Sequence, residues 1–346
     1  MRISFLHAVC AASALTLLAG CSGVGPSAVA PSSGNGLMHV GLHQNTQGRS
    51  TSVLPGKFQR PATRGVKQFV NHNSCSATGM LVYVSDAANG VVNIYDNGTT
   101  LCGQITGFSE PQGMTVHKHV LYVANTGFEN IEAFNRGSTS PDMTLTDPSG
   151  QFPVDVAVAP DGTIIGSNIF SPNTGLGSVS TWTKTGTFVE NFVPGGLLES
   201  FFITTFHNGT VFEDGFDANG FAGLWSFSCP GGVCSGDVEL GEPFVFPGGL
   251  VQTKSFDLLG LDQISDTADT FELPSLTPAT FTENGGDNVD VDTTKTRPYQ
   301  VWTGDALNNE LVCYQYKQDG SSPGSCGTVP GNTFGDDLGV AIDPGF

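Results

Sequence analysis

The chain has 346 residues, including 46 Gly and 20 Pro, and only 13% of its residues are charged. Its 13 Lys and Arg residues stand against 32 Asp and Glu residues, which gives a formal charge of −19. This balance argues against a nucleic-acid ligand and against direct contact with anionic lipid, because binding phosphate requires clustered basic side chains. The apolar runs after residue 20 are short and end at Gly, Asn, Asp or Pro, which predicts an all-β fold.

Residues 1–20 have the organisation of an export signal. Arg2 is followed by an apolar run over residues 3–18, which is too short to cross a bilayer as a helix. The sequence that follows, Leu-Ala-Gly-Cys, resembles the lipobox of bacterial lipoproteins. That resemblance implies a lipoprotein signal peptide, cleavage before Cys21, lipidation of the Cys21 thiol and a place in the bacterial cell envelope. Ser22 after the cysteine favours the outer membrane.

Residues 21–64 are rich in Ser, Pro, Gly, Asn and Gln and poor in large apolar side chains. Such a segment cannot bury enough apolar surface to offset the entropy of ordering. We therefore expect a flexible tether between the lipidated cysteine and a folded domain over residues 65–346. The alternative to lipidation is an ordinary signal peptide that is cut after Ala30. Apart from the lipid anchor, the sequence predicts no contact with the membrane.

A short pattern recurs six times in the expected domain. Each copy has an apolar run, one or two small residues and an Asp or Asn, and is followed by a turn and a second strand-like run. The copies cover residues 81–86, 121–125, 164–168, 211–214, 259–262 and 301–305, so the repeat length lies between 39 and 48 residues. A period of about 40 to 50 residues with several strands per unit indicates a β-propeller with one repeat per blade.

The second copy indicates how many strands a blade contains. Strand-like runs cover residues 120–125, 130–134 and 143–145, and the run at 154–158 begins the next unit, which gives four strands per blade. The last run, at residues 339–344, is similar to these first strands, and only two residues follow it. We expect it to become the innermost strand of the first blade, which closes a ring of six blades without an open edge.

The repeat resembles the NHL-type repeat of six-bladed, TolB-like β-propellers. The similarity is greatest at residues 121–125, which are followed by Asn130, Ile131 and Phe134, and it covers about residues 70–346. It implies a six-bladed propeller and fixes no activity. The copies of blades 4 and 5 depart from the repeat because they lack a clear Asn-Ile pair.

The Asp or Asn that ends each copy is the first candidate for a functional residue. We expect these side chains at equivalent places near one mouth of the central channel: Asp86, Asn125, Asn168, Asp214, Asp262 and Asp305. The favoured interpretation is structural, because a short acceptor at a strand end hydrogen-bonds backbone N–H groups nearby and fixes the following turn. The alternative is that the carboxylates converge and bind a divalent cation such as calcium.

A second resemblance bears on that alternative. Six-bladed propellers of the gluconolactonase and senescence-marker group are metal-dependent lactone hydrolases, which place a Glu on the first inner strand and Asn and Asp from later blades around one ion. The resemblance implies Asn168 with Asp214 or Asp262 as ligands, and Asp343 in place of a Glu that the first blade lacks. Otherwise the sequence predicts no cofactor.

The cysteines are compatible with three disulfides in an exported protein. Cys10 would leave with the signal peptide and Cys21 would be lipidated, so six remain. Six cysteines allow 15 pairings, but proximity in the sequence favours two of the bonds and elimination leaves the third. The expected bonds are Cys229 with Cys234, Cys313 with Cys326 and, by elimination, Cys75 with Cys102.

Three further patterns have ordinary explanations. His117 and His119 alternate on one strand without a third ligand, so we expect them at the surface. The Gly-x-Ser-x-Gly match at residues 320–324 places Pro323 where an oxyanion hole needs a backbone N–H, so it predicts a loop. Residues 287–292 alternate Asp with Asn and Val, which predicts a strand with solvated carboxylates rather than a calcium loop.

Two functions from different classes remain. The favoured one is a non-catalytic propeller that presents its loops and channel mouth to a protein, peptide or glycan partner in the cell envelope. The alternative is a metal-dependent hydrolase of the gluconolactonase type. The first predicts neither a bound divalent ion nor turnover.

Overall fold

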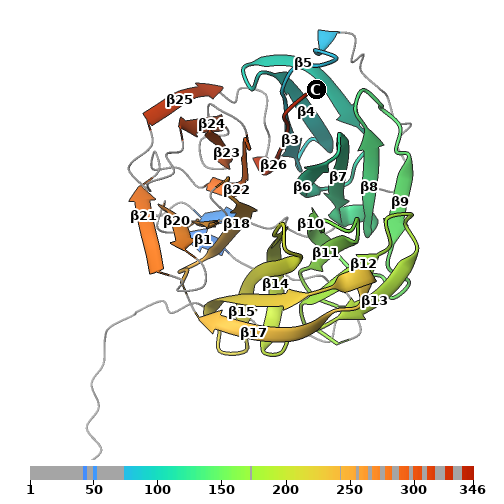
Figure 1. Cartoon of the computed structure of the whole chain (residues 1–346), viewed down its shortest axis with the longest axis vertical. Helices are drawn as coiled ribbons and strands as arrows, with labels where there is room; N and C mark the ends of the chain where they lie inside the picture. The colour runs from blue at the N-terminus through green and yellow to red at the C-terminus, as the bar shows by residue number, and fades with distance from the viewer. Residues whose placement is uncertain are drawn as a thin grey trace, which may run out of the picture.

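Six four-stranded antiparallel sheets surround a central axis like the blades of a propeller (Figure 1). The computed structural model describes residues 42–44, 50–52, 74–171, 174–241, 243–254, 257–263, 267–272, 277–282, 288–295, 299–305, 310–315, 324–329 and 337–346. This arrangement confirms the predicted all-β fold with six blades. Helical structure in this part of the chain is confined to short 3-10 turns such as η2 (Thr126–Phe128) and η3 (Pro230–Gly232).

The predicted signal peptide, Cys21 and the proposed boundary at residue 65 lie outside the described residues. Within the predicted tether, the structure describes one short antiparallel pair, β1 (Leu42–Gln44) and β2 (Ser50–Ser52). Among the residues described, no helix is both long and apolar enough to cross a membrane.

The strands of each blade follow one another from the channel outward. Blade 1 contains β26 (Asp337–Asp343), β3 (Leu81–Asp86), β4 (Val91–Asp96) and β5 (Thr100–Thr106). Blade 2 contains β6 (Pro111–His117), β7 (Val120–Asn125), β8 (Asn130–Asn135) and β9 (Met143–Thr146). Blade 3 contains β10 (Pro153–Val158), β11 (Ile164–Asn168), β12 (Ser178–Trp182) and β13 (Phe188–Phe192).

The remaining blades repeat this order. Blade 4 contains β14 (Leu197–Thr205), β15 (Thr210–Asp217), β16 (Ala222–Ser228) and β17 (Ser235–Gly241). Blade 5 contains β18 (Pro247–Gln252), β19 (Leu258–Asp262), β20 (Thr267–Glu272) and β21 (Thr277–Thr282). Blade 6 contains β22 (Asn288–Thr293), β23 (Gln300–Asp305), β24 (Glu310–Gln315) and β25 (Gly324–Val329).

The ring closes as the sequence predicted. β26, from the C-terminal end of the chain, pairs with β3, with Val340 opposite Val84 and Ala341 opposite Tyr83. Blade 1 therefore combines strands from both ends of the domain, and the first and last blades meet without an open edge. We call the side where the six inner strands begin the entry face, and the side where they end the exit face.

Apolar side chains hold neighbouring blades together. They alternate along each strand, so that one set faces the preceding blade and the other set faces the next blade. Ile131 of blade 2 packs with Val156 and Trp182 of blade 3, and Val84 of blade 1 packs with Trp302 of blade 6. Each fully buried side chain of this size contributes about 1.5–3 kcal/mol, so the ring is stabilised mainly between blades.

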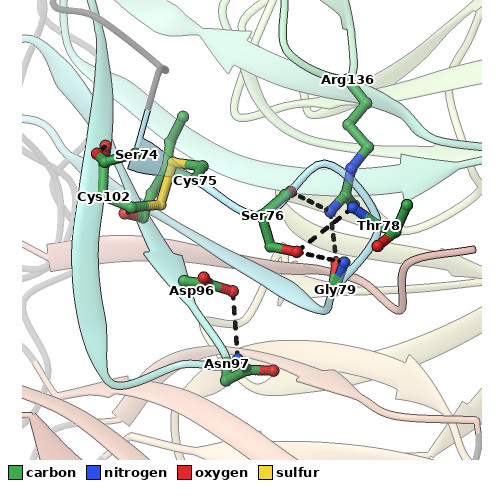
Figure 2. Close-up of a disulfide and its surroundings, with 10 residues drawn as sticks. Ser74, Cys75, Ser76, Thr78, Gly79, Asp96, Asn97, Cys102 and Arg136 are labelled. Carbon is green, nitrogen blue, oxygen red and sulfur yellow. Dashed lines mark hydrogen bonds between the residues drawn. A yellow bond between two sulfur atoms is a disulfide. The ribbon is translucent and has the colours of Figure 1, made fainter.

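Three disulfides form, and they join the pairs expected from the sequence. Cys75–Cys102 connects the segment before β3 to β5, as Figure 2 shows. Cys229–Cys234 closes the loop that contains η3, between β16 and β17. Cys313–Cys326 links the adjacent strands β24 and β25. Each bond therefore reinforces a single blade.

One arginine connects both ends of the domain. The Arg136 guanidinium donates through Nε to the Ala77 carbonyl at 3.2 Å and through Nη2 to the carbonyls of Ser76, at 3.0 Å, and Gly79 (Figure 2). Its Nη1 lies 2.6 Å from Asp343 Oδ2 at the end of β26. Because both charged side chains are buried, this ion pair fixes the closing strand against the segment that leads into β3.

Candidate functional site

The central channel contains a cavity of about 480 Å³ that all six inner strands line. The turns at Lys118, Lys295 and Pro344 also contribute to its wall, so the cavity opens toward the exit face. Its lining combines apolar side chains such as Val156 and Leu250 with hydroxyl, carboxyl and basic groups. The cavity therefore combines depth with several kinds of polar group, as ligand sites do.

Two carboxylates from blades on opposite sides of the ring lie in this wall. Asp155 of β10 and Asp290 of β22 are each 3% exposed. Asp155 accepts the N–H of Val156 at 2.7 Å and, from the next blade, the N–H of Ile203 at 2.9 Å. Each oxygen of Asp155 therefore has a backbone donor, and the side chain joins the inner strands of blades 3 and 4.

Blade 6 has two carboxylates that bridge to the next blade in the same way. Asp290 accepts the N–H of Val291 at 2.7 Å and that of Val340 on β26 at 3.0 Å. Asp292 accepts the N–H of Thr293 at 2.6 Å and that of Ile342 on β26 at 2.7 Å. The inner strand of blade 6 is thereby bonded to the closing strand at two levels.

The surroundings of these carboxylates favour their neutral forms. Burial raises the pKa of Asp155 well above its ordinary value, against the pull of its two backbone N–H donors. Burial also raises the pKa of Asp290, and the charge of Asp155 across the channel adds to that rise. Burial raises the pKa of Asp292 as well, whereas the positive charge of the nearby Lys295 acts to lower it.

Glycines on the preceding blades make room for the two opposed carboxylates. A Cβ atom on Gly113 of β6 would lie 2.2 Å from Asp155 Oδ1, and one on Gly249 of β18 would lie 2.5 Å from Asp290 Oδ1. A side chain at Gly113 would require the Asp155 carboxylate to move, and one at Gly249 would also collide with the backbone of β22, 2.5 Å from the Val291 nitrogen. Asp155 therefore contacts the inner strands of blades 2 and 4, and Asp290 those of blades 5 and 1.

Basic groups surround the mouth of the cavity. Lys295 Nζ donates to Thr293 Oγ1 at 2.8 Å and to the Gln252 carbonyl. His117 lines the wall, where burial and the charge of Lys118 lower its pKa, and its buried Nε2 has no hydrogen-bond partner among the described residues. Because β6 ends at His117, the expectation of two surface histidines on one strand is wrong: His119 lies in the turn that follows, with φ 65°.

The recurring Asp and Asn residues lie at the entry face, away from this cavity. Five of them pair with the first residue of an inner strand. The pairs are Asp86 with Asp337, Asn125 with Pro111, Asn168 with Pro153, Asp262 with Pro247 and Asp305 with Asn288. All five are at most 4% exposed, and none lines the cavity. The structure therefore gives them equivalent places in their blades but does not gather them around one point.

Their contacts are local. Asp86 Oδ1 accepts the Asn89 N–H at 2.9 Å, Asn125 Oδ1 accepts the Ser109 N–H at 2.8 Å, and Asp262 Oδ2 accepts the Val245 N–H at 2.7 Å. Asn168 Nδ2 donates to Ser180 Oγ at 2.8 Å. These contacts favour the interpretation that the recurring residues fix the connections at the entry face.

The copy in blade 4 differs from the others. β15 continues three residues beyond Asp214, so that Asp217 pairs with Leu197 at the start of the inner strand. Asp214 is fully buried inside the blade and accepts the Phe202 N–H at 2.8 Å. Burial raises its pKa well above the ordinary value, and the adjacent Glu213 adds to the effect.

The residues implied as ligands by the lactonase resemblance are not brought together. Asn168, Asp214 and Asp262 lie in the entry halves of three blades, whereas Asp343 lies at the opposite end, beside Arg136 and 2.8 Å from His119 Nδ1. In the part of the chain that the structure describes, no three His, Cys, Asp or Glu residues form a group that could hold a metal ion.

Sequence reasoning missed Asp155 and misjudged Asp290. The predicted strand over residues 287–292 is present as β22, but the expectation of solvated carboxylates is wrong for Asp290, which is buried. The signal was available, because residues 154–156 and 289–291 both read Val-Asp-Val. A charged residue inside an otherwise apolar inner strand must find hydrogen-bond partners, and here the next blade supplies them.

Comparisons with known proteins support the fold alone. No protein-family model matches the chain, and no curated protein matches it in sequence. Among solved structures, 831 chains match, so the likeness does not select one function. A chain of the nidogen/laminin complex has a TM-score of 0.62 at 14% identity, covering 76% of this chain and 98% of that chain.

Two further solved structures illustrate the range. Hydrazine synthase from Kuenenia stuttgartiensis has a TM-score of 0.54 at 10% identity, covering 78% of this chain and 90% of that chain. A functionally unknown protein from Desulfotomaculum acetoxidans DSM 771 has a TM-score of 0.52 at 12% identity, covering 74% and 83%. At these identities the similarity shows the propeller fold and nothing about ligands.

Proposed function

We propose that this chain is a non-catalytic binding module, a propeller that presents its loops and channel mouth to a protein, peptide or glycan partner outside the cytoplasm. The observation that carries the proposal is the bonding of the channel carboxylates. Asp155, Asp290 and Asp292 each accept one backbone N–H from their own blade and one from the next blade. Such side chains stabilise the ring, and they are poorly placed to act as acids, bases or metal ligands.

The three disulfides support a location outside the cytoplasm, because such bonds persist in oxidising compartments. The lipobox-like sequence that ends at Cys21 supports a lipid anchor in the bacterial envelope, at the outer membrane, with the NHL-type propeller held beyond the tether. A propeller of the same fold occurs in the nidogen/laminin complex, which is compatible with a role in binding a protein.

The hydrolase alternative makes a different demand on the fold. It requires Asn168, together with Asp214 or Asp262, to share one ion with Asp343. Asp343, however, is bonded to Arg136 at the other face of the ring. A divalent cation such as calcium would therefore have to use only the entry-face residues.

The experiment combines calcium-dependent melting with partner capture. We expect calcium to leave the melting temperature of the purified chain unchanged, and the same result for Asp262→Asn and for the exposed control Glu239→Gln. We also expect crosslinking capture from an envelope fraction to recover one partner in stoichiometric amount. A stoichiometric bound ion, with calcium stabilisation that Asp262→Asn abolishes, would overturn the proposal in favour of the hydrolase.

A further inference from the structure

Blade 4 presents an acidic surface without basic side chains. Between Lys184 and Lys254 the sequence contains no Lys or Arg. The same stretch contains eight acidic residues, namely Glu190, Glu199, Glu213, Asp214, Asp217, Asp237, Glu239 and Glu242. Glu213 and Asp214 are buried and Glu190 belongs to β13 of blade 3, whereas Asp217, Asp237 and Glu239 carry negative charge at the surface of blade 4.

Three of these carboxylates and two exposed apolar side chains lie on the outer part of blade 4. Asp217 and Phe221 lie at its entry end, whereas Asp237 and Glu239 lie along β17. We define the blade-4 patch as Val193, Asp217, Phe221, Asp237 and Glu239. Phe221 is 55% exposed and Val193 is 37% exposed. Aromatic side chains are enriched at protein interfaces, where polar and charged groups form the rim.

Hydrogen bonds and strand pairing connect the segments that carry the patch. Asp237 Oδ2 of β17 accepts the Gly195 N–H at 2.7 Å, in the connection that begins at Val193. Leu197, two residues after Gly195, pairs with Asp217. Asp217 Oδ1 in turn accepts the Phe221 N–H at 2.8 Å. One connection therefore joins the outer strand of the blade to the turn that carries Phe221.

The patch is rigid. Below it, the rings of Phe201, Phe216 and Phe246 pack edge to face, with centroids between 5.2 and 6.0 Å apart. The Cys229–Cys234 bond closes the connection that leads into β17. A rigid surface loses little conformational entropy on binding, which favours affinity.

The patch is also accessible and stays charged. Every residue of β17 except Leu240 is exposed, whereas all five residues of the corresponding strand β13 are half-buried. Within the described residues, no strand pairs with the outer edge of β17 (Figure 1). Despite slight burial, N–H donors from Phe221 and Asn219 lower the pKa of Asp217, so its carboxylate is ionised at neutral pH.

We infer that the blade-4 patch binds a basic, partly apolar segment of a partner protein. The segment places Lys or Arg opposite Asp217, Asp237 and Glu239 and an apolar side chain against Phe221 and Val193. An Arg guanidinium gains a further contact by stacking on the Phe221 ring. The inference rests on the proposed function as a binding module and names the surface and the chemistry of its partner.

The probe is a short labelled peptide that alternates Lys with Val, with a counterpart in which Glu replaces Lys. On the full chain we expect the basic peptide alone to bind, and binding to weaken with salt. Glu239→Lys and Phe221→Ser should each weaken it about tenfold. The matched controls are Glu129→Lys, on the entry face of blade 2, and Phe346→Ser, another exposed ring; both should bind as the wild type does.

Three results would overturn the inference. The first is an equal loss with Glu129→Lys, which means attraction to overall charge. The second is a zero-length crosslink between Lys57 or Lys67 and Glu239, which means that the chain's own N-terminal segment occupies the patch. The third is a dimer that Glu239→Lys dissociates, which means a second copy. The channel plays no part in this assay, so a bound ion there would contradict the proposed function and leave the patch result intact.

Discussion

The Arg136 side chain contacts both the segment before β3 and the closing strand β26. Its planar guanidinium uses several donors at once, on three backbone carbonyls before β3 and on Asp343 of the closing strand. A lysine ammonium is a point charge on a flexible stem and does not reproduce this fork. The contribution of Arg136 therefore depends on its shape as well as on its charge.

We predict that Arg136→Ala lowers the free energy of unfolding by about 3–5 kcal/mol, because it leaves the buried Asp343 carboxylate without its cation. Arg136→Lys should recover less than half of that loss. Urea unfolding followed by tryptophan fluorescence measures both. Lys184→Ala, at an exposed turn of blade 3, is the control and should change stability by less than about 0.5 kcal/mol. A lysine variant as stable as the wild type would contradict the role of the fork.

Side-chain partners that are close in sequence could be predicted, whereas partners on another blade could not be identified, although the Val-Asp-Val sequences mark the residues that need them. The recurring Asp and Asn residues bond to turns or connections of the same or an adjacent unit, for example Asp86 to Asn89. Asp155 bonds to Ile203 and Asp290 to Val340, about fifty residues away. Those contacts exist only once the ring places neighbouring inner strands side by side, so the strand sequence alone does not reveal them.

At the scale of elements, the blade hairpins explain why the disulfide pairing was accessible to sequence reasoning. Cys313 and Cys326 lie on neighbouring strands of one blade, and Cys229 and Cys234 flank one short connection, so both pairs meet without knowledge of the ring. Cys75 with Cys102 then follows by elimination. Blade 4 departs from the repeat. There the pattern ends at Asp214, but β15 continues to Asp217, because Phe216 also finds an apolar environment next to Phe201 and Phe246.

The three disulfides should differ in their effects on stability. The two cysteines are 27 residues apart in Cys75–Cys102, 13 apart in Cys313–Cys326 and 5 apart in Cys229–Cys234. Loop-closure entropy predicts losses of about 3.5, 2.9 and 2.1 kcal/mol when each pair is replaced by Ala. Thermal unfolding of the three double variants gives the order. If the Cys229–Cys234 variant lost as much as the Cys75–Cys102 variant, loop closure would not explain the stabilisation.

At the scale of the whole molecule, acidic residues are concentrated in the propeller. All 32 Asp and Glu residues follow residue 73, together with seven of the 13 Lys and Arg residues. The ring therefore has to bury some carboxyl groups without basic partners. Burial raises the pKa of Glu213 from 4.5 to about 8, and that of Glu199 from 4.5 to about 7. The channel carboxyls Asp155 and Asp290 are raised as well.

These shifts make the folded chain take up protons that the unfolded chain has released. Between pH 4.5 and about 8, the folded state binds more protons, so stability is greatest at the acidic end of this range and falls as pH rises. Below about pH 4 the sign reverses at Asp343. Although burial opposes it, hydrogen bonds from Gly345, Arg136 and His119 lower the pKa of Asp343, and protonation there removes the ion pair.

We therefore predict that the melting temperature is higher at pH 5 than at pH 8, and that Glu213→Gln reduces the difference. An amide occupies nearly the same volume as the carboxyl and does not titrate, so the variant lacks one of the protons that link folding to pH. Each such proton contributes up to about 1.4 kcal/mol per pH unit within its window. The control is Glu239→Gln, at an exposed position of β17, which should keep the wild-type slope. Stability that rises from pH 5 to pH 8 would mean that Glu213 and the channel carboxyls are ionised in the folded ring, with counter-charges supplied from outside the described residues.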